Sequence, residues 1–132
     1  MSQRLRILLA DDDAGVVKAT SRALSTECEI VGSVSDIDGL LQAAVQLVPE
    51  VVLLDLSLCD KSRGLGIIRH MRMIAPKVSI IVFTAHDDPE LERATLAAGA
   101  AAFVWKLAGF SKLLETIHRV IDQARPGAAC GS

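Results

Sequence analysis

The stretch RILLADDD, residues 6–13, joins a short apolar run to three successive aspartates, Asp11, Asp12 and Asp13. The apolar part predicts a buried β-strand, because it is short, continuous and rich in large aliphatic side chains. Like charges on successive residues repel, and strands disfavour Asp, so the strand has to end where the aspartates begin. The stretch therefore predicts a buried strand with several carboxylates at its carboxyl end.

Four more apolar runs follow along the chain and alternate with stretches that predict helices. The predicted strands are 6–10, 29–34, 51–55, 79–84 and 101–105, and the second is the weakest because Gly32 interrupts it. The predicted helices are 14–25, 36–48, 64–74, 88–98 and 111–124. This alternation predicts an α/β fold, a doubly wound five-stranded parallel sheet with helices on both faces.

Cap signals mark the ends of several predicted helices. Ser35, with Asp38 three residues later, resembles a capping box, and Pro49 ends that helix. Gly99 is expected to end the helix that starts after Asp88. The expected N-caps are Asp13, Ser35, Asp88 and Ser111.

Length and composition exclude several classes of protein. The chain has 132 residues, of which 51% are hydrophobic, enough for one domain with a real core. We expect that domain over 1–124 and a mobile tail over 125–132, where the apolar periodicity is lost. The apolar runs are too short to span a membrane, and the formal net charge of −2 gives no basic surface for nucleic acid.

The cysteines indicate a compartment. Cys28, Cys59 and Cys130 are odd in number and widely spaced, so they predict neither a metal site nor a disulfide framework. No N-terminal secretion signal is visible. These features favour the reducing cytoplasm.

The residues that follow the strands predict a binding site. In an open α/β sheet, ligands bind outside the carboxyl ends of the strands. There the chain places Asp11, Asp12, Asp55, Thr84 and Lys106. Clustered carboxylates need a cation, and oxygen ligands alone suit Mg²⁺ or Mn²⁺. The Thr hydroxyl and the Lys ammonium are then free for an anion such as a phosphoryl group, which an Asp carboxylate can accept covalently.

In these motifs the sequence resembles the response-regulator receiver domains of two-component signalling. The resemblance covers residues 4–124 and rests on the acidic pair after the first strand, PEVVLLDLSL, VFTA and GAAAFVWK. It implies a flavodoxin-like sheet with strand order 2-1-3-4-5. Two segments, LVPEVVLLDLS and LAAGAAAFVWK, resemble most the receivers that precede helix-turn-helix output domains.

The resemblance also implies a role for each site residue. Asp55 is the implied phosphoacceptor, Thr84 and Lys106 bind phosphoryl oxygens, and Phe103 occupies the position of an aromatic switch residue that acts with Thr84. The implied ligands of Mg²⁺ are Asp11, Asp12, Asp55 and the backbone carbonyl of Ser57.

The implied function is a phosphoacceptor switch rather than an enzyme, one that assists only its own phosphorylation and dephosphorylation. A histidine kinase donates the phosphoryl group, and a homodimer or an output domain meets the face formed by the fourth helix, fifth strand and fifth helix. Trp105 is expected to be partly exposed on that face, because the side chains of a strand alternate between its two sides. His86, two residues after Thr84, either borders the site or is an ordinary loop residue.

Three departures from the family pattern leave an alternative open. Cys59 stands where many relatives have proline, the loop after it is about one residue longer, and Leu107 replaces the usual proline after Lys106. A receiver-like interaction module that works without phosphorylation is therefore the alternative function. A haloacid-dehalogenase-type phosphatase would need Asp at position 57, and a flavin site would need a glycine- and hydroxyl-rich loop after the first strand.

Overall fold

The computed structural model describes residues 4–59 and 61–124, and its elements follow one another as the sequence predicts. The strands are β1 (Leu5–Ala10), β2 (Cys28–Val34), β3 (Val51–Leu54), β4 (Ser79–Thr84) and β5 (Ala102–Trp105). The helices are α1 (Ala14–Leu24), α2 (Ile37–Leu47), α3 (Lys61–Ile74), α4 (Pro89–Ala98) and α5 (Phe110–Ala124). Two short 3-10 helices, η1 (Leu56–Leu58) and η2 (Lys106–Ala108), follow β3 and β5. The tail expected over 125–132 and the third cysteine, Cys130, lie outside the described residues.

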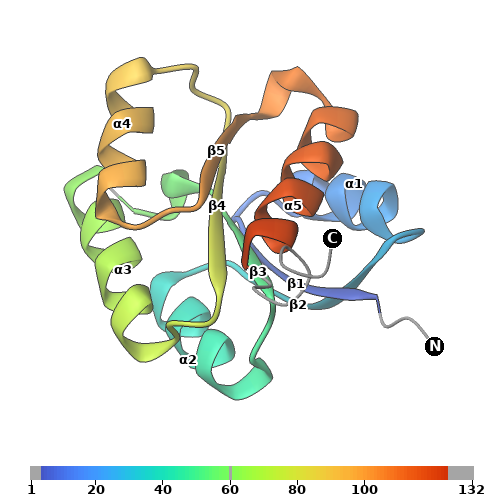
Figure 1. The fold of residues 1–132 in the computed structure, drawn as a ribbon, viewed down its shortest axis with the longest axis horizontal. Coiled ribbons are helices and arrows are strands. Elements are labelled where there is room, and N and C mark those ends of the chain that lie inside the picture. The colour runs from blue at the N-terminus through green and yellow to red at the C-terminus, as the bar shows by residue number, and fades with distance from the viewer. Residues whose placement is uncertain (1–3, 60, 125–132) are drawn as a thin grey trace.

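The strands form one parallel sheet in the order β2-β1-β3-β4-β5, which confirms the implied topology. Helices cover both of its faces (Figure 1). Alternate residues of each strand, such as Ile7 and Leu9 of β1, pack with α1 and α5 on one face. Their neighbours, such as Leu8 and Ala10, pack with α2, α3 and α4 on the other. The apolar runs are therefore continuous because both faces of the sheet are buried.

The second strand forms despite Gly32. Its pairing with β1 skips one residue between Ile30 and Gly32, so the glycine lies next to a bulge and not at a strand end. A Cβ atom at Gly32 would approach Leu47 of α2 to 3.2 Å. Glycine at this position therefore leaves room for α2 to pack closely against β2.

Several helix boundaries differ from the predictions. The Ser35 capping box is wrong, because the Asp36 carboxylate caps α2 by accepting from the Gly39 N–H at 2.6 Å. Ser111 lies inside α5, whose first turn closes on the Gly109 carbonyl at 3.2 Å. The third helix begins at Lys61 and not at residue 64.

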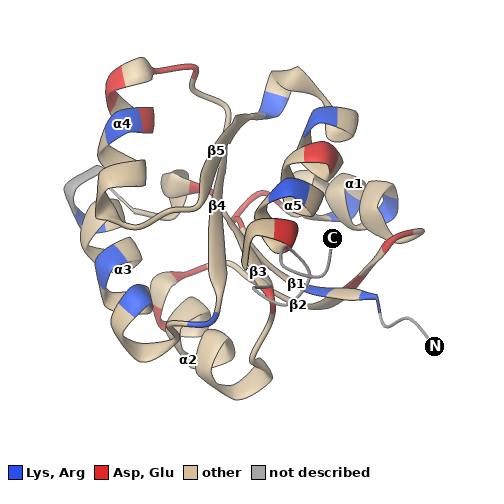
Figure 2. Cartoon of the chain, viewed as in Figure 1, with Lys and Arg blue, Asp and Glu red and all other residues tan. Residues whose placement is uncertain are grey.

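The remaining cap predictions are confirmed. Asp13 accepts from the backbone N–H groups of Gly15 and Val16, and Asp88 accepts from those of Glu90 and Leu91. Figure 2 shows acidic residues gathered in the loop before α4 and in its first turn, where they favour the positive end of the helix dipole. Gly99 ends α4 at φ 124°, a backbone conformation that a Cβ atom disfavours.

Candidate functional site

The site lies at the carboxyl edge of the sheet, where β1 and β3 end level with each other. Ala10 and Leu54 are paired across the two strands, so the next residues, Asp11 and Asp55, emerge together. The Asp55 backbone N–H donates to the Ala10 carbonyl at 2.8 Å, which continues the ladder one residue beyond β3. Pairing of the two strands therefore sets the positions of both carboxylates.

The three predicted acidic residues form one cluster. Asp11, Asp12 and Asp55 each place a carboxylate oxygen so that the three atoms lie within 4.8 Å of one another. Asp12 is exposed, whereas Asp11 and Asp55 are 8% and 6% exposed. This cluster could bind one hard cation, because all of its donor atoms are carboxylate oxygens and one side of the cluster is open to water.

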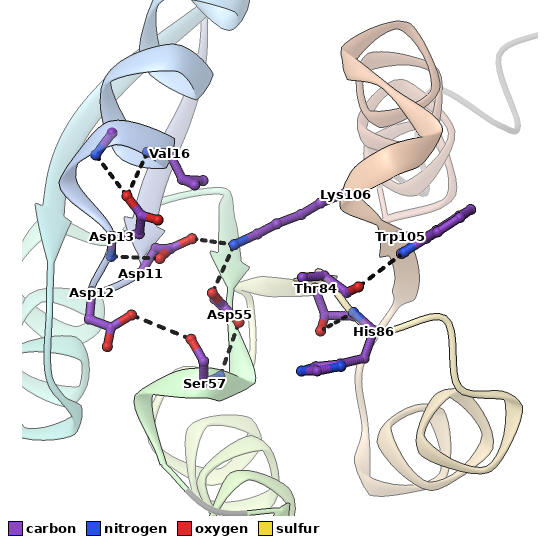
Figure 3. Close-up of polar contacts among 12 residues, drawn as sticks. Asp11, Asp12, Asp13, Val16, Asp55, Ser57, Thr84, His86, Trp105 and Lys106 are labelled. Atoms are coloured by element: carbon purple, nitrogen blue, oxygen red, sulfur yellow. Dashed lines mark hydrogen bonds and ion pairs between the residues drawn. The ribbon is translucent and has the colours of Figure 1, made fainter.

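Lys106 reaches the cluster from the end of β5 and binds both buried carboxylates. Its Nζ atom lies 2.8 Å from Asp11 Oδ2 and 2.8 Å from Asp55 Oδ2 (Figure 3). It also lies 5.8 Å from the centroid of the Phe83 ring, within the range of a cation–π contact. Three carboxylates facing one ammonium leave a local excess of two negative charges, which matches a divalent cation.

Local hydrogen bonds hold the other carboxylate oxygens. The backbone N–H of Asp13 donates to Asp11 Oδ1 at 2.9 Å, and that of Ser57 donates to Asp55 Oδ1 at 3.0 Å. The Ser57 hydroxyl donates to Asp12 Oδ1 at 3.4 Å, which brings Ser57 beside the acidic cluster. The turn into η1 therefore places the backbone N–H of Ser57 beside Asp55 and its hydroxyl beside Asp12.

The two buried carboxyl groups differ in their pKa values. Burial raises the pKa of Asp11, and hydrogen bonds from Lys106 and the Asp13 backbone offset only part of the effect. Burial also acts to raise the pKa of Asp55, but hydrogen bonds from Lys106 and Ser57 outweigh it and leave that pKa lowered. Burial acts to lower the pKa of Lys106, but its two carboxylate partners outweigh burial and raise it. At neutral pH, Asp55 is therefore held ionised.

Thr84 and Trp105 lie at the ends of the neighbouring strands. Thr84 is buried, and its hydroxyl oxygen accepts from the His86 backbone N–H at 3.2 Å (Figure 3). A hydroxyl that accepts one hydrogen bond can also donate one. His86 thus borders the site through its backbone. Trp105 is partly exposed, as predicted, and its indole N–H donates to the Ala85 carbonyl at 3.1 Å. Phe103 is half-buried against the layer that α2, α3 and α4 cover.

Sequence reasoning missed Phe83 as a neighbour of Lys106. Phe83 was only part of an apolar run, and the alternation of β4 places it on the face that α1 and α5 cover. Its ring also lies 6.5 Å, between centroids, from that of Phe110 in α5. The contact depends on how far the Lys106 side chain reaches across the sheet edge, which no local pattern encodes.

Comparison with known proteins agrees with this geometry. The family model described as the response regulator receiver domain matches residues 7–118. Among curated proteins, the chain is 34% identical over 105 residues to the methanol utilization control regulatory protein MoxX of Paracoccus denitrificans, covering 77% of this chain and 47% of MoxX. It is 30% identical over 118 residues to the oxygen regulatory protein NreC of Staphylococcus aureus, covering 88% of this chain and 54% of NreC.

A solved structure is also similar. A CheY-like response regulator receiver domain protein from Methanospirillum hungatei aligns with a TM-score of 0.81 and 25% identity, covering 92% of this chain and 97% of that one. The chain spans about half the length of the curated relatives it matches. Since the family model matches most of the chain and the sheet order is 2-1-3-4-5, the chain belongs to the response-regulator receiver domains.

Proposed function

We propose that the chain is a phosphoacceptor switch of a two-component pathway, in which Asp55 accepts a phosphoryl group from the phosphohistidine of a histidine kinase. One observation carries the proposal: the ionised Asp55 lies with Asp11 and Asp12 in one carboxylate cluster and is bound by Lys106 at 2.8 Å. A carboxylate in such a setting is a nucleophile with its charge-balancing groups already in place.

Each residue of the site has a different role in the proposed phosphoryl transfer. An Asp55 oxygen attacks phosphorus as the P–N bond of phosphohistidine breaks, which leaves an acyl phosphate. Lys106 is positioned to pair with a phosphoryl oxygen, and the Thr84 hydroxyl to donate to another. Asp11, Asp12, Asp55 and the Ser57 carbonyl would hold Mg²⁺ or Mn²⁺, which when bound supplies positive charge against the charge of the transferred group.

The switch follows from new contacts. A phosphoryl group on Asp55 adds acceptor oxygens beside Thr84 and Lys106, so both side chains are drawn toward it and a second conformation is favoured. Moving the population from 1:99 to 99:1 needs about 5.5 kcal/mol of differential stabilisation. Phe103 and the α4–β5–α5 face are the parts that we propose relay this change to a second copy or an output domain. In this view the chain modifies only itself and is not an enzyme for other substrates.

The cytoplasm is the compartment we propose. Cys28 is a buried free thiol, and free thiols persist where the environment is reducing. Within residues 4–59 and 61–124, no helix is long and apolar enough to cross a membrane.

Phosphorylation with acetyl phosphate and Mg²⁺ tests the proposal. Intact-mass measurement should show one added phosphoryl group on the parent protein and none on Asp55→Asn. Asp122→Asn removes an exposed carboxylate of α5 and is the matched control, which should be modified like the parent. A parent that stays unmodified by acetyl phosphate and by beryllofluoride would favour the phosphorylation-independent interaction module instead.

A further inference from the structure

A buried threonine beneath the acidic cluster has an unpaired hydroxyl. Thr20 of α1, Thr95 of α4 and Thr116 of α5 are 2%, 0% and 2% exposed. The hydroxyl of Thr95 donates to the Glu92 carbonyl at 2.9 Å, and that of Thr116 to the Lys112 carbonyl at 2.8 Å. The Thr20 hydroxyl has no hydrogen-bond partner among the described residues. Buried hydroxyl groups are rarely left without a partner, so Thr20 calls for one.

Thr20 lines a small cavity whose wall also includes residues of the site. Its volume is about 10 Å³ for the centre of a water-sized sphere, and Asp11, Thr20 and Asp55 contribute to its wall. The other wall residues are apolar and come from β1, α1, β3 and β4, including Phe83. The cavity has room for a single water molecule and too little for a larger ligand.

We propose that this cavity binds one ordered water molecule, through which Thr20 positions the carboxylates of Asp11 and Asp55. The water accepts from the Thr20 hydroxyl and donates one proton to each carboxylate, which makes the three hydrogen bonds typical of buried water. Both carboxylates have capacity for it, because an ionised carboxylate offers about four acceptor positions. The described bonds from Lys106 and from backbone N–H groups use two on each residue.

Thr20 is thus a positioning residue that acts on the carboxylates from the α1 side of the sheet. Lys106 and the two backbone N–H groups hold the carboxylates from the sides, and the water would hold them from the α1 side of the sheet. Partners of this kind orient metal ligands, and their loss typically weakens metal affinity 10–100-fold. The consequence for cation binding rests on the proposed function, whereas the water site itself does not.

Two variants separate this role from a purely structural one. Thr20→Val keeps the shape of the side chain and removes the hydroxyl, whereas Thr20→Ser keeps the hydroxyl. Thr116→Val is the control, because it removes a buried helical hydroxyl of equal burial that bonds within its own helix.

The first measurement is made on the metal-free protein. Nuclear Overhauser effects between a long-lived water and the side chain at position 20 should appear in the parent and in Thr20→Ser, and be lost in Thr20→Val. A parent without such a water, or with its Thr20 hydroxyl bonded to the Val16 carbonyl, would overturn the site whether or not the protein is a phosphoacceptor.

The second measurement is a Mg²⁺ titration followed by the fluorescence of Trp105, the one tryptophan. The Mg²⁺ dissociation constant should rise about tenfold in Thr20→Val, while Thr20→Ser and Thr116→Val stay within about twofold of the parent. An unchanged constant in Thr20→Val would overturn the positioning role and leave the proposed function standing. A parent that binds no Mg²⁺ would contradict both that role and the cation site, while the water measurement still decides whether the cavity is hydrated.

Discussion

Among single residues, Asp11 and Asp55 differ in how folding shifts their pKa values, although both contact Lys106. Asp11 has a raised pKa, so its ionised form is disfavoured by the folded state. Its stabilising contribution is therefore present below the ordinary carboxyl pKa of 3.8 and is lost as the pH rises through the raised value. Asp55 has a lowered pKa, so its contribution is present above 3.8 and is lost as the pH falls through the lowered value.

This difference predicts opposite effects on stability at pH 7 without metal. Asp11→Asn should raise the midpoint of thermal unfolding, because it removes a buried charge that the fold disfavours. Asp55→Asn should lower it, because it removes a charge that Lys106 and Ser57 stabilise. Calorimetry in the presence of a chelator measures the unfolding midpoints of both variants. The control, Asp122→Asn, should leave the midpoint nearly unchanged. Shifts of the same sign for Asp11→Asn and Asp55→Asn would contradict the assignment.

At the scale of elements, the end of α2 contains a strained residue. Val48 follows the helix in the left-handed conformation, with φ 46° and ψ 59°, which β-branched residues rarely adopt. Its carbonyl accepts from Arg6 Nη1 at 2.8 Å, and Pro49 follows it. The connection to β3 therefore requires a backbone geometry that glycine adopts more easily.

Replacement of Val48 by glycine should stabilise the protein. Relief of left-handed strain, roughly 1–2 kcal/mol, exceeds the cost of about 0.5–1 kcal/mol for the added freedom of the unfolded chain. The free energy of unfolding in urea should rise by about 0.5–1 kcal/mol. Val45→Gly, at a similarly exposed position inside the same helix, should lower it, since glycine is the poorer helix former. If Val48→Gly lowered the free energy of unfolding, backbone strain at Val48 would be smaller than the entropic cost of glycine, and the prediction would be wrong.

At the scale of the whole molecule, the acidic site and the α4–β5–α5 face are linked through the end of β5. Lys106 contacts the carboxylates of the site. The indole N–H of the preceding residue, Trp105, donates a hydrogen bond to the carbonyl of Ala85, which follows Thr84. Both α4 and α5 contact β5, and each carries an exposed apolar side chain, Leu96 on α4 and Phe110 on α5. A shift of Thr84 and Lys106 toward a phosphoryl group would therefore alter the surroundings of Trp105.

Trp105 should contribute to the self-association that we propose for the modified protein. With beryllofluoride and Mg²⁺, sedimentation should show association of the parent, weakened at least about 30-fold in Trp105→Ala, the size expected of an interface hot spot. Phosphorylation of Asp55 should be unaffected in this variant. Met73→Ala, an exposed apolar residue of α3, is the control and should associate like the parent. Equal association of all three proteins would exclude Trp105 from the interface.

Local sequence patterns predicted the strands, the alternating α/β order and the acidic residues at the strand ends. These features are local: an apolar run predicts a strand, and the residue after it lies at the carboxyl edge of a parallel sheet. Asp13 and Asp88 were predictable as caps because each bonds to N–H groups two and three residues ahead. Ser35 was mispredicted because the neighbouring Asp36 is an equally good cap, and only the direction in which β2 enters α2 chooses between them.

Which of these residues contact one another depends on packing between elements that are far apart along the chain. Asp11 and Lys106 are separated by 95 positions, and their 2.8 Å contact depends on β3 and β4, the two strands between β1 and β5, and on the registers of the three pairings. The Phe83 ring beneath Lys106 and the unpaired hydroxyl of Thr20 likewise arise from packing between α1, α5 and the sheet. Such contacts follow from the balance of burial, charge and shape over the whole core, whereas sequence patterns report on neighbours along the chain.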